Sequence, residues 1–450
     1  MFRIQWLNKL SPVQMIVLFY MVAVVLATVL LALPIAHQAN VDIAFIDILF
    51  TAVSALSVTG LSSVTIVETF STTGFIILAI ILQLGAVGVM AIGTFFWLIL
   101  GKKIGLKERR LIMTDQNQTQ FSGMVRLVKQ MLIVLGTTEL FAFLLLGTYY
   151  LRYFPTTREA YFHGFFATIS AVSNGGFDIT GQSLIPFKDD YLVQSIHMFL
   201  IIFGAIGFPV LIELKTYLFQ KVKKQTSVHF TLFTKLTTVT FVILIVAGAF
   251  FIYLFDAHRF FAEQSWHERL FYALFQSVTT RSGGLSTMDV SLFSDANHLF
   301  MSFLMFIGAS PSSAGGGIRT TTFALVVIFI MTYARGGESI RLFRREVYPE
   351  DLLKAVTVTF MAIALIFVSV LMIAATESFS MIQILFEVTS AFGTVGLSLG
   401  ITDELGLFSK IVLMVLMFIG RVGVLTFLFT FKRKNKSGKF HYPKEKMIIG

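Results

Sequence analysis

Long apolar runs alternate with shorter polar stretches along this chain, and the apolar runs predict helices that cross a membrane. A run of about 20 apolar residues spans about 30 Å of hydrocarbon at about 1.5 Å per residue. The first run is too long for a secretory signal peptide and has no small-residue cleavage site before Pro34, so we expect a retained helix. Eight spans are expected, at residues 12–34, 75–100, 128–151, 191–219, 231–255, 298–334, 353–375 and 407–431.

Four shorter amphipathic stretches have a different character. At about 12 to 15 residues they are too short to span, and each precedes a glycine-containing segment, which is typical of a re-entrant helix. The expected re-entrant helices cover residues 43–57, 160–173, 267–280 and 381–393.

The glycine segments recur four times, with their third residues 108 to 116 positions apart. Any one copy also fits a helix-packing glycine or a plain turn. Fourfold recurrence favours a pore, because four copies of one unit can surround an axis within a single chain. The segments are Val58-Thr59-Gly60-Leu61, Asn174-Gly175-Gly176-Phe177, Ser282-Gly283-Gly284-Leu285 and Thr394-Val395-Gly396-Leu397.

A second recurring glycine, called the mark here, follows the third glycine of each segment by 24 to 28 residues. The four marks are Gly85, Gly204, Gly308 and Gly420. Segments and marks in register predict internal quadruplication, with all four copies in the same direction. The predicted fold is an all-α polytopic membrane protein of four parallel helix–pore loop–helix repeats around a central pore. The expected units are residues 1–110, 111–225, 226–345 with a broken second span, and 346–431, followed by a cytoplasmic tail at 432–450.

Composition and charge support this topology. The chain is 56% hydrophobic and 13% charged, more apolar than a soluble core requires. The net charge of +10 sits mostly on the side that carries both termini, which the positive-inside rule places in the cytoplasm. Cysteine is absent from the sequence, so disulfides and thiolate metal sites are excluded. The outer side keeps only Arg152, Arg158, Lys188, Arg259, Arg269 and Lys410.

Irregular backbone at membrane depth leaves polar groups unpaired unless it lines water or coordinates an ion. Glycine lets successive carbonyls face one side, so four such segments predict rings of carbonyl oxygens. Rings of this kind replace the water shell of a monovalent cation.

Two features below the expected filter point to a gate. Arg421 lies midway along the last span, where a cation facing lipid is costly, so we expect it to face the pore axis; the alternative is a staple between helices. The sixth span is interrupted by ten small or helix-breaking residues, which predict an intramembrane gating loop; the alternative is a simple kink. That stretch is Gly308-Ala309-Ser310-Pro311-Ser312-Ser313-Ala314-Gly315-Gly316-Gly317.

Other polar residues carry weaker signals. Arg281 and Glu387 suggest a brace between two loops, or two separately solvated groups. Glu139 in the third span pairs with a neighbouring helix or binds an ion. His163 and His197, like the other histidines, lack metal-ligand spacing and are interpreted as interfacial. Catalytic constellations and nucleotide fingerprints are also absent, so we expect no enzyme, and any nucleotide dependence must come from a partner.

The ordered set of motifs resembles the Trk/Ktr/HKT potassium transporters, with the greatest likeness to KtrB-type membrane subunits of bacterial Ktr uptake systems. The residues that carry the resemblance are the segment 174–177, the runs Thr279-Thr280-Arg281-Ser282-Gly283-Gly284 and Ser390-Ala391-Phe392-Gly393-Thr394-Val395-Gly396-Leu397, and Phe418-Ile419-Gly420-Arg421.

The resemblance implies potassium uptake through a single-file filter in a bacterial plasma membrane, with potassium held by backbone carbonyls. It also implies a homodimer, a cytosolic ring of nucleotide-binding regulatory subunits of the RCK/KTN type, and gating roles for the loop and Arg421. Gly60 matches members that favour potassium. Ser282-Gly283-Gly284-Leu285 departs from the usual Thr-Ala-Gly-Phe of the third loop, which leaves the preference over sodium open.

Passive potassium movement driven by the membrane potential is therefore the leading functional hypothesis. An ion-coupled secondary transporter, sodium-linked or sodium-permeable, is the alternative. Potassium is the expected substrate, and this chain is expected to hold no cofactor of its own.

Overall fold

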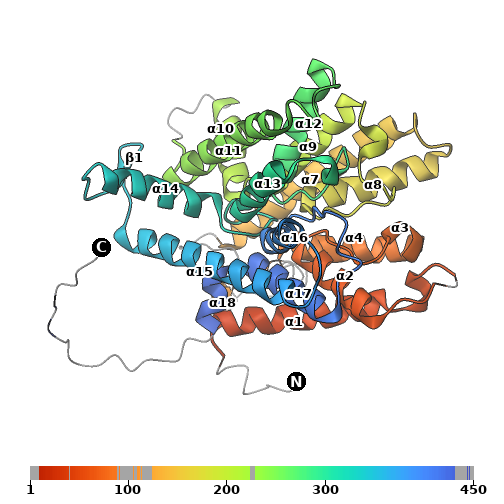
Figure 1. The fold of residues 1–450 in the computed structure, drawn as a ribbon. Coiled ribbons are helices and arrows are strands. Elements are labelled where there is room, and N and C mark those ends of the chain that lie inside the picture. The colour runs from red at the N-terminus through yellow and green to blue at the C-terminus, as the bar shows by residue number, and fades with distance from the viewer. Residues whose placement is uncertain are drawn as a thin grey trace.

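The computed structural model describes residues 10–39, 41–88, 124–222 and 229–430, together with 91, 105, 109–111, 113, 443 and 445 (Figure 1). These residues are predominantly helical. In chain order the helices are α1 (Pro12–Leu31), α2 (Phe45–Ser57), α3 (Ile66–Thr69), α4 (Thr72–Val87), α7 (Met124–Tyr150), α8 (Thr157–Ser173), α9 (Tyr191–Ala205), α10 (Phe208–Val222), α11 (Leu232–Asp256), α12 (Trp266–Thr279), α13 (Asp295–Ile307), α14 (Thr320–Ala334), α15 (Pro349–Ala374), α16 (Met381–Gly393), α17 (Leu407–Val422) and α18 (Val424–Thr430).

The predicted helix, short helix, irregular segment and second helix recur in all four units. The long first helices α1, α7, α11 and α15 are long and apolar enough to cross a membrane. The short helices α2, α8, α12 and α16 match the expected re-entrant stretches to within three residues at either end. Their starts are set locally: Ser380 and Gln383 form a capping box at α16, as Ser265 and Glu268 do at α12.

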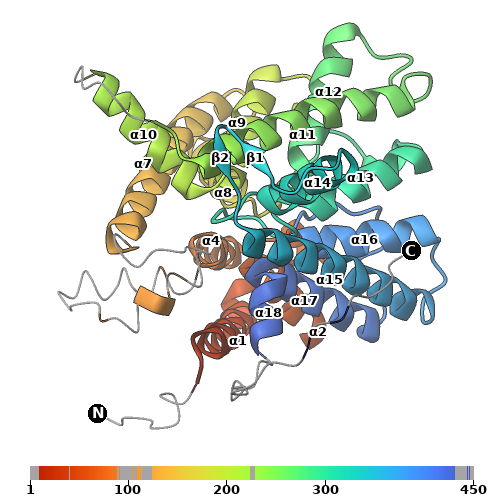
Figure 2. The same ribbon diagram turned by 90° about the vertical axis from the view of Figure 1, so that its left-hand side faces the viewer.

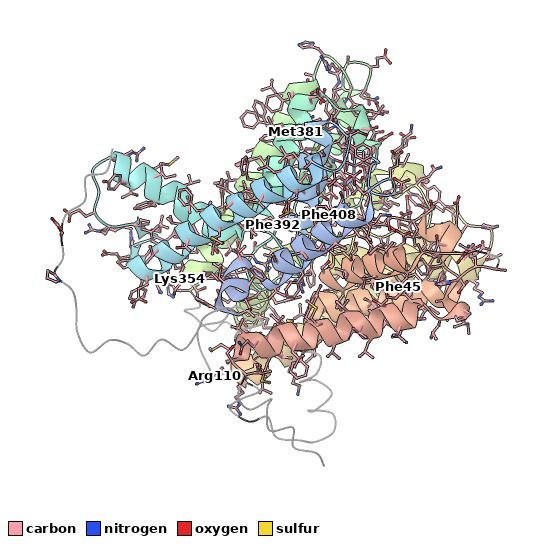
Figure 3. All side chains as sticks on the ribbon, turned by 60° about the horizontal axis from the view of Figure 1, so that its bottom comes forward. Phe45, Arg110, Lys354, Met381, Phe392 and Phe408 are labelled. Carbon is pink, nitrogen blue, oxygen red and sulfur yellow. The ribbon has the colours of Figure 1, made fainter. Side chains whose placement is uncertain are left out.

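The four units close into a ring. Each short helix packs against a second helix of the preceding unit: α8 against α4, α12 against α9, α16 against α13, and α2 against α17. The last contact joins the end of the chain to its beginning. Figures 1 and 2 show the units, coloured from red to blue in chain order, arranged side by side around a common centre. In Figure 3, α16 runs from Met381 at the edge of the molecule toward Phe392 in its middle.

Two carboxylates, the buried Asp256 and the half-buried Glu377, tie the first helix of a unit to the start of its second helix. Asp256, the last residue of α11, accepts hydrogen bonds from the Ser294 backbone N–H at 3.2 Å and from Asn297 Nδ2 at 2.7 Å. Glu377, just after α15, accepts one from the Gly406 N–H at 2.9 Å. Both acids satisfy donors at a helix start, so they stabilise a helix N-terminus and the packing of a unit together.

The second helices are not the continuous spans predicted at 191–219 and 407–431. The pair α9 and α10 is bent by 105°, and the pair α17 and α18 by 103°. Gly207 and Gly423, with φ of +99° and +95°, occupy these bends in backbone conformations that residues with a Cβ rarely adopt. In the first unit α4 ends at Val87 before Gly88, which has φ +89°, and the rest of the span expected at 75–100 lies almost wholly outside the described residues.

A two-stranded hairpin between α14 and α15 is a small departure from the all-α expectation. Its strands are β1 (Arg341–Leu342) and β2 (Arg345–Glu346), and they pair antiparallel. Phe343 and Arg344 both have positive φ, as a tight two-residue hairpin turn requires. The predicted tail at 432–450 lies outside the described residues except for 443 and 445, and the predicted unit boundaries stay predictions.

Replacing Asp256 with alanine should destabilise the third unit. The change leaves the Ser294 N–H without this acceptor inside the protein, at a cost of about 1–3 kcal/mol. Thermal unfolding of the purified protein in detergent would show a lower Tm. Asp289→Ala is the matched control, because Asp289 is exposed and caps only the neighbouring Ser291. Equal Tm values for the two variants would contradict this role of Asp256.

Candidate functional site: the glycine ring and the loop beneath it

Each glycine segment begins with a residue in the left-handed backbone region. Val58, Asn174 and Thr394 have φ of 59°, 59° and 48° and directly follow α2, α8 and α16. In the third unit α12 ends at Thr279, and Ser282, with φ 73°, takes the equivalent place after a longer turn. All four side chains are fully buried. Non-glycine residues with positive φ are uncommon and occur where surrounding structure holds them, so the four sites are built features.

The third glycine is the partly exposed residue of each segment. Its three companions are buried in all four copies. The four glycines also share positive φ, at 93°, 67°, 71° and 93° for Gly60, Gly176, Gly284 and Gly396. The backbone of these glycines is therefore what the segments present to the space between them.

The four glycines form a closed ring in chain order. A Cβ built on Gly60 would lie 2.9 Å from the Cα of Gly176, and one on Gly176 would lie 3.0 Å from that of Gly284. A Cβ on Gly284 would lie 3.5 Å from the Cα of Gly396, and one on Gly396 would lie 3.0 Å from that of Gly60. Side chains cannot be added at these positions without pushing the segments apart.

Hydroxyl groups of the short helices hold the segments from behind, and sequence reasoning missed them. In units one and four, Ser54 Oγ and Ser390 Oγ accept hydrogen bonds from the third glycines' N–H groups, both at 3.1 Å. In units two and three, Ser170 Oγ and Thr279 Oγ1 donate to the carbonyls of the fourth segment residues, both at 2.5 Å. The available signal was a serine or threonine five or six residues before every third glycine.

An acidic cavity of about 400 Å³ opens against one side of the ring. Gly60 and Gly176 form part of its wall. Asp178 and Asp403 also line it and give it a negative potential. Asp178 is held in place by the backbone N–H groups of Thr180 and Gly181, at 2.9 and 2.8 Å.

The second glycine mark has a steric explanation. A Cβ on Gly85, Gly204 or Gly420 would collide with the carbonyl oxygen of Leu56, Val172 or Phe392 respectively, each two residues before a glycine segment. The mark therefore lets the second helix of a unit approach the end of the short helix. The third unit departs from this pattern, because a Cβ on Gly308 would meet the Gly316 carbonyl of its own loop instead.

The loop between α13 and α14 is an unwound segment and not a simple kink. The Ala309 N–H donates to the Gly316 carbonyl at 3.1 Å, so the loop folds back on itself. It is also bonded to the bend of the second unit: Ser310 N–H donates to the Ala205 carbonyl and Ala314 N–H to the Gly204 carbonyl, both at 3.0 Å. The stretch 308–317 is almost entirely buried, so it fills the space it occupies.

Arg421 binds this loop and the end of α4 together. Its Nη1 donates to the Ala314 carbonyl at 2.6 Å and to the Ser313 carbonyl at 3.2 Å. Its Nη2 donates to the carbonyls of Gly85 and Ala86, the latter at 3.0 Å. These bonds to free carbonyls are compatible both with an arginine that faces the pore axis and with a staple between helices, so the gating role of Arg421 stays a prediction. Arg319 adds a bond from its Nη1 to the Gly315 carbonyl.

Other charged candidates lie apart from this assembly. Glu387 accepts bonds from Ser398 and, at 3.0 Å, from Thr402 Oγ1, whereas Arg281 donates from Nη2 to the Leu304 carbonyl at 2.7 Å. These two described side chains form no ion pair with each other, so the predicted brace is wrong. Glu139 accepts a hydrogen bond from Gln83 of α4, which favours helix pairing over ion binding.

The histidines are scattered, as expected, but one prediction about them is wrong. His197 is fully buried in α9 and bonds the Val193 carbonyl at 2.8 Å, so it is not interfacial. The described part of the chain contains no group of three or more His, Asp or Glu residues that could hold a metal ion.

Comparisons with known proteins agree with this architecture. The family model described as TrkH, cation transport protein, matches residues 8–442. The chain is 56% identical to the Ktr system potassium uptake protein D of Bacillus subtilis, over 99% of this chain and 98% of the relative. It is 33% identical to the Ktr system potassium uptake protein B of the same organism, over 99% and 98%.

A crystal structure of the potassium transporter TrkH from Vibrio parahaemolyticus has the same fold, with a TM-score of 0.68 at 20% sequence identity. The match covers 92% of this chain and 84% of that one. The resemblance inferred from the four glycine segments is thereby confirmed. The chain belongs to the TrkH family of cation transport proteins.

Proposed function

We propose that this chain is the membrane subunit of a Ktr-type system, through which potassium enters a bacterial cell in single file. The observation that carries the proposal is the closed ring of four partly exposed glycines in otherwise buried segments. Two relatives that match nearly the whole chain are named as potassium uptake proteins of Ktr systems. The membrane potential supplies about 2.3 kcal/mol per charge per 100 mV, so inward movement needs no chemical cycle.

Ion selection belongs to the sixteen residues of the four segments, at 58–61, 174–177, 282–285 and 394–397. With glycine at the ring, backbone carbonyls replace the water that a cation sheds on entering. The short helices end at or just before the segments, so their partly negative C-termini lie near the ring and favour a cation there. Asp178 and Asp403 in the adjoining cavity raise the local cation concentration before the ion loses its water.

Gating belongs to the loop 308–317 and Arg421. Hydrogen bonds from a guanidinium are among the stronger ones because the donor is charged. The Arg421 bonds hold the loop against α4, where it is packed with Val58 and Ala86 of unit one. Ions pass when the loop leaves this position, and Arg421 sets how readily it does so.

Regulation is assigned to other chains. By analogy with the Ktr systems named above, we expect a homodimer bound to a cytosolic ring of nucleotide-binding subunits. The basic hairpin at 341–346 is one docking candidate, although topogenic charge explains it equally well. Sodium movement remains the second candidate, since a relative from Enterococcus hirae, 31% identical over 98% of both chains, is named a potassium/sodium uptake protein.

Expression of this chain with a Ktr regulatory subunit should restore growth of a potassium-uptake-deficient bacterium at low external potassium. The readout is the growth rate as a function of potassium, with and without added sodium. Failure of rescue by the co-expressed pair would refute potassium uptake. Rescue that strictly requires sodium would favour the ion-coupled alternative.

Alanine or serine at Gly60, Gly176, Gly284 or Gly396 should reduce uptake or change ion preference, because a Cβ meets the neighbouring segment in every case. The measurement is rubidium uptake into vesicles with potassium or sodium as competitor. We expect at least about a tenfold change in one parameter, because positive-φ strain and overpacking each cost about 1–3 kcal/mol and about 1.4 kcal/mol corresponds to tenfold. Gly136→Ala is the control, since Gly136 lies in α7 with open space around it. Unchanged transport in all four variants would refute the filter assignment.

Arg421→Ala should increase flux through the membrane subunit in the absence of its regulator. The change removes charged bonds to loop and helix carbonyls, each contributing about 1.5–3 kcal/mol, so a rise of about tenfold is expected. Rubidium uptake by vesicles that contain the chain alone measures it. Arg152→Ala, which alters a residue stacked on Tyr149 far along the chain, controls for loss of charge. Flux equal to or below that of the unchanged chain would contradict a closing role.

A further inference from the structure

Ser282 makes hydrogen bonds to another unit and to the loop that the first residues of the first two glycine segments, Val58 and Asn174, do not make. Its Oγ lies 2.6 Å from the carbonyl of Thr394, the first residue of the fourth segment, and 3.0 Å from the carbonyl of Gly393, the last residue of α16. The same Oγ accepts a hydrogen bond from the Gly316 N–H of the loop at 3.3 Å. One fully buried hydroxyl therefore joins the third segment, the fourth segment and the loop.

The loop is fitted closely to this junction. A Cβ on Gly315 would lie 2.5 Å from both Cβ and Oγ of Ser282, and one on Gly316 would lie 2.6 Å from Cγ2 of Thr394. Gly315, which packs against Ser282, also accepts hydrogen bonds at its carbonyl from Arg319 and Arg421. The loop is thus held between a hydroxyl of the ring segments and two guanidinium groups.

The equivalent residues of units one and two make no side-chain hydrogen bond to another unit, although the apolar Val58 also packs against Ala314 of the loop. Val58 Cγ2 lies where a Cβ on Gly85 would be 2.7 Å away, and Asn174 contacts Gly204 and donates to the Ile201 carbonyl at 3.3 Å. Both partners belong to the second helix of the same unit. Ser282 therefore takes part in a contact between units and with the loop, which the fourfold pattern does not require.

The chemistry of a hydroxyl sets what this contact can do. It has one hydrogen to donate and two lone pairs to accept with. While the loop is in place, Gly316 N–H fills a lone pair and the hydrogen is directed to the carbonyls of Gly393 and Thr394. Departure of the loop removes the Gly316 donor, and Thr394 Oγ1, which lies 3.1 Å from Ser282 Oγ, is then the group that can donate to the vacated lone pair, so the hydrogen bonding at the start of the fourth segment changes.

We propose that Ser282 is a positioning residue that couples the loop to the fourth glycine segment, so that movement of the loop changes ion preference as well as flux. The inference rests on the proposed function, in which the loop is the gate and the segments select the ion. It follows that the geometry at the junction of segments three and four, and with it the ion preference, differs between the closed and the open position of the loop.

Loop exposure is the direct test, and the absence of cysteine from the sequence makes it clean. Ser313→Cys places one thiol in the loop of the full-length protein, at a site 6% exposed. Its reaction rate with a small charged thiosulfonate reagent is measured in vesicles with Ser282, with Ser282→Ala and with Arg421→Ala. Ser302→Ala is the matched control, since that buried hydroxyl bonds only the His298 carbonyl of its own helix.

Both Ser282→Ala and Arg421→Ala should speed labelling, the former by about fivefold, the change expected for loss of one typical buried hydrogen bond. Faster labelling with Arg421→Ala alone would overturn the role of Ser282 and leave the gate proposal standing. No effect of either variant would overturn both.

The coupling itself is tested by ion competition. Rubidium uptake by the Ser282→Ala variant should be inhibited by sodium at a severalfold lower concentration than uptake by the unchanged chain, because the Thr394 carbonyl loses its hydroxyl partner. The Ser302→Ala control should match the unchanged chain. Faster labelling with unaltered sodium competition would show that Ser282 only latches the loop, and would overturn the coupling.

Discussion

The structure depends on one constraint: four stretches of backbone must meet inside a membrane with no side chain between them. Unpaired backbone groups at that depth cost several kcal/mol each, so every segment needs support from behind and something to coordinate in front. The short helices and their hydroxyls supply the support. The second helices can approach the short helices because Gly85, Gly204 and Gly420 leave room for a carbonyl oxygen near the end of each short helix. Glycine is thus required at the ring, where four segments meet, and at the mark, where a second helix meets a short helix, for the same reason: a Cβ would collide with neighbouring backbone.

The ring is fourfold in outline, but its four glycines fall into two adjacent pairs in detail. Gly60 and Gly396 share φ +93° and a hydroxyl that accepts from their N–H groups. Gly176 and Gly284 share φ near +70° and a hydroxyl that donates to the next carbonyl. Two kinds of backbone geometry around one axis present unequal ligands to an ion, which differs from the equivalent ligands that four identical subunits supply.

Much of this architecture is readable in the sequence because it depends on local patterns. The bounds of α2 and α16 follow from amphipathic length and from the glycine segment that ends each helix. The bends at Gly207 and Gly423 were missed, since apolar residues continue across them and nothing in composition separates a straight helix from a bent pair. The Arg281 and Glu387 brace failed for another reason: each side chain found partners close to it, which charge complementarity alone does not reveal.

The third unit differs from the others because its mark glycine, Gly308, does not contact the short helix. In the other units the mark glycine faces a short helix, so the second helix stays against the segment it supports. In the third, Gly308 faces Gly316, and the chain between them is free to form a loop that reaches the second and fourth units. The guanidinium of Arg421 then satisfies carbonyls that no regular helix could pair, including those of Gly85 and Ala86 at the end of α4. The half-buried Arg421 is stable here because the breaks in the second helices of units one and three leave carbonyl acceptors for it. The broken helices thus supply the acceptors, and the second helix of unit four supplies the charge that holds the loop in place without disturbing the ring.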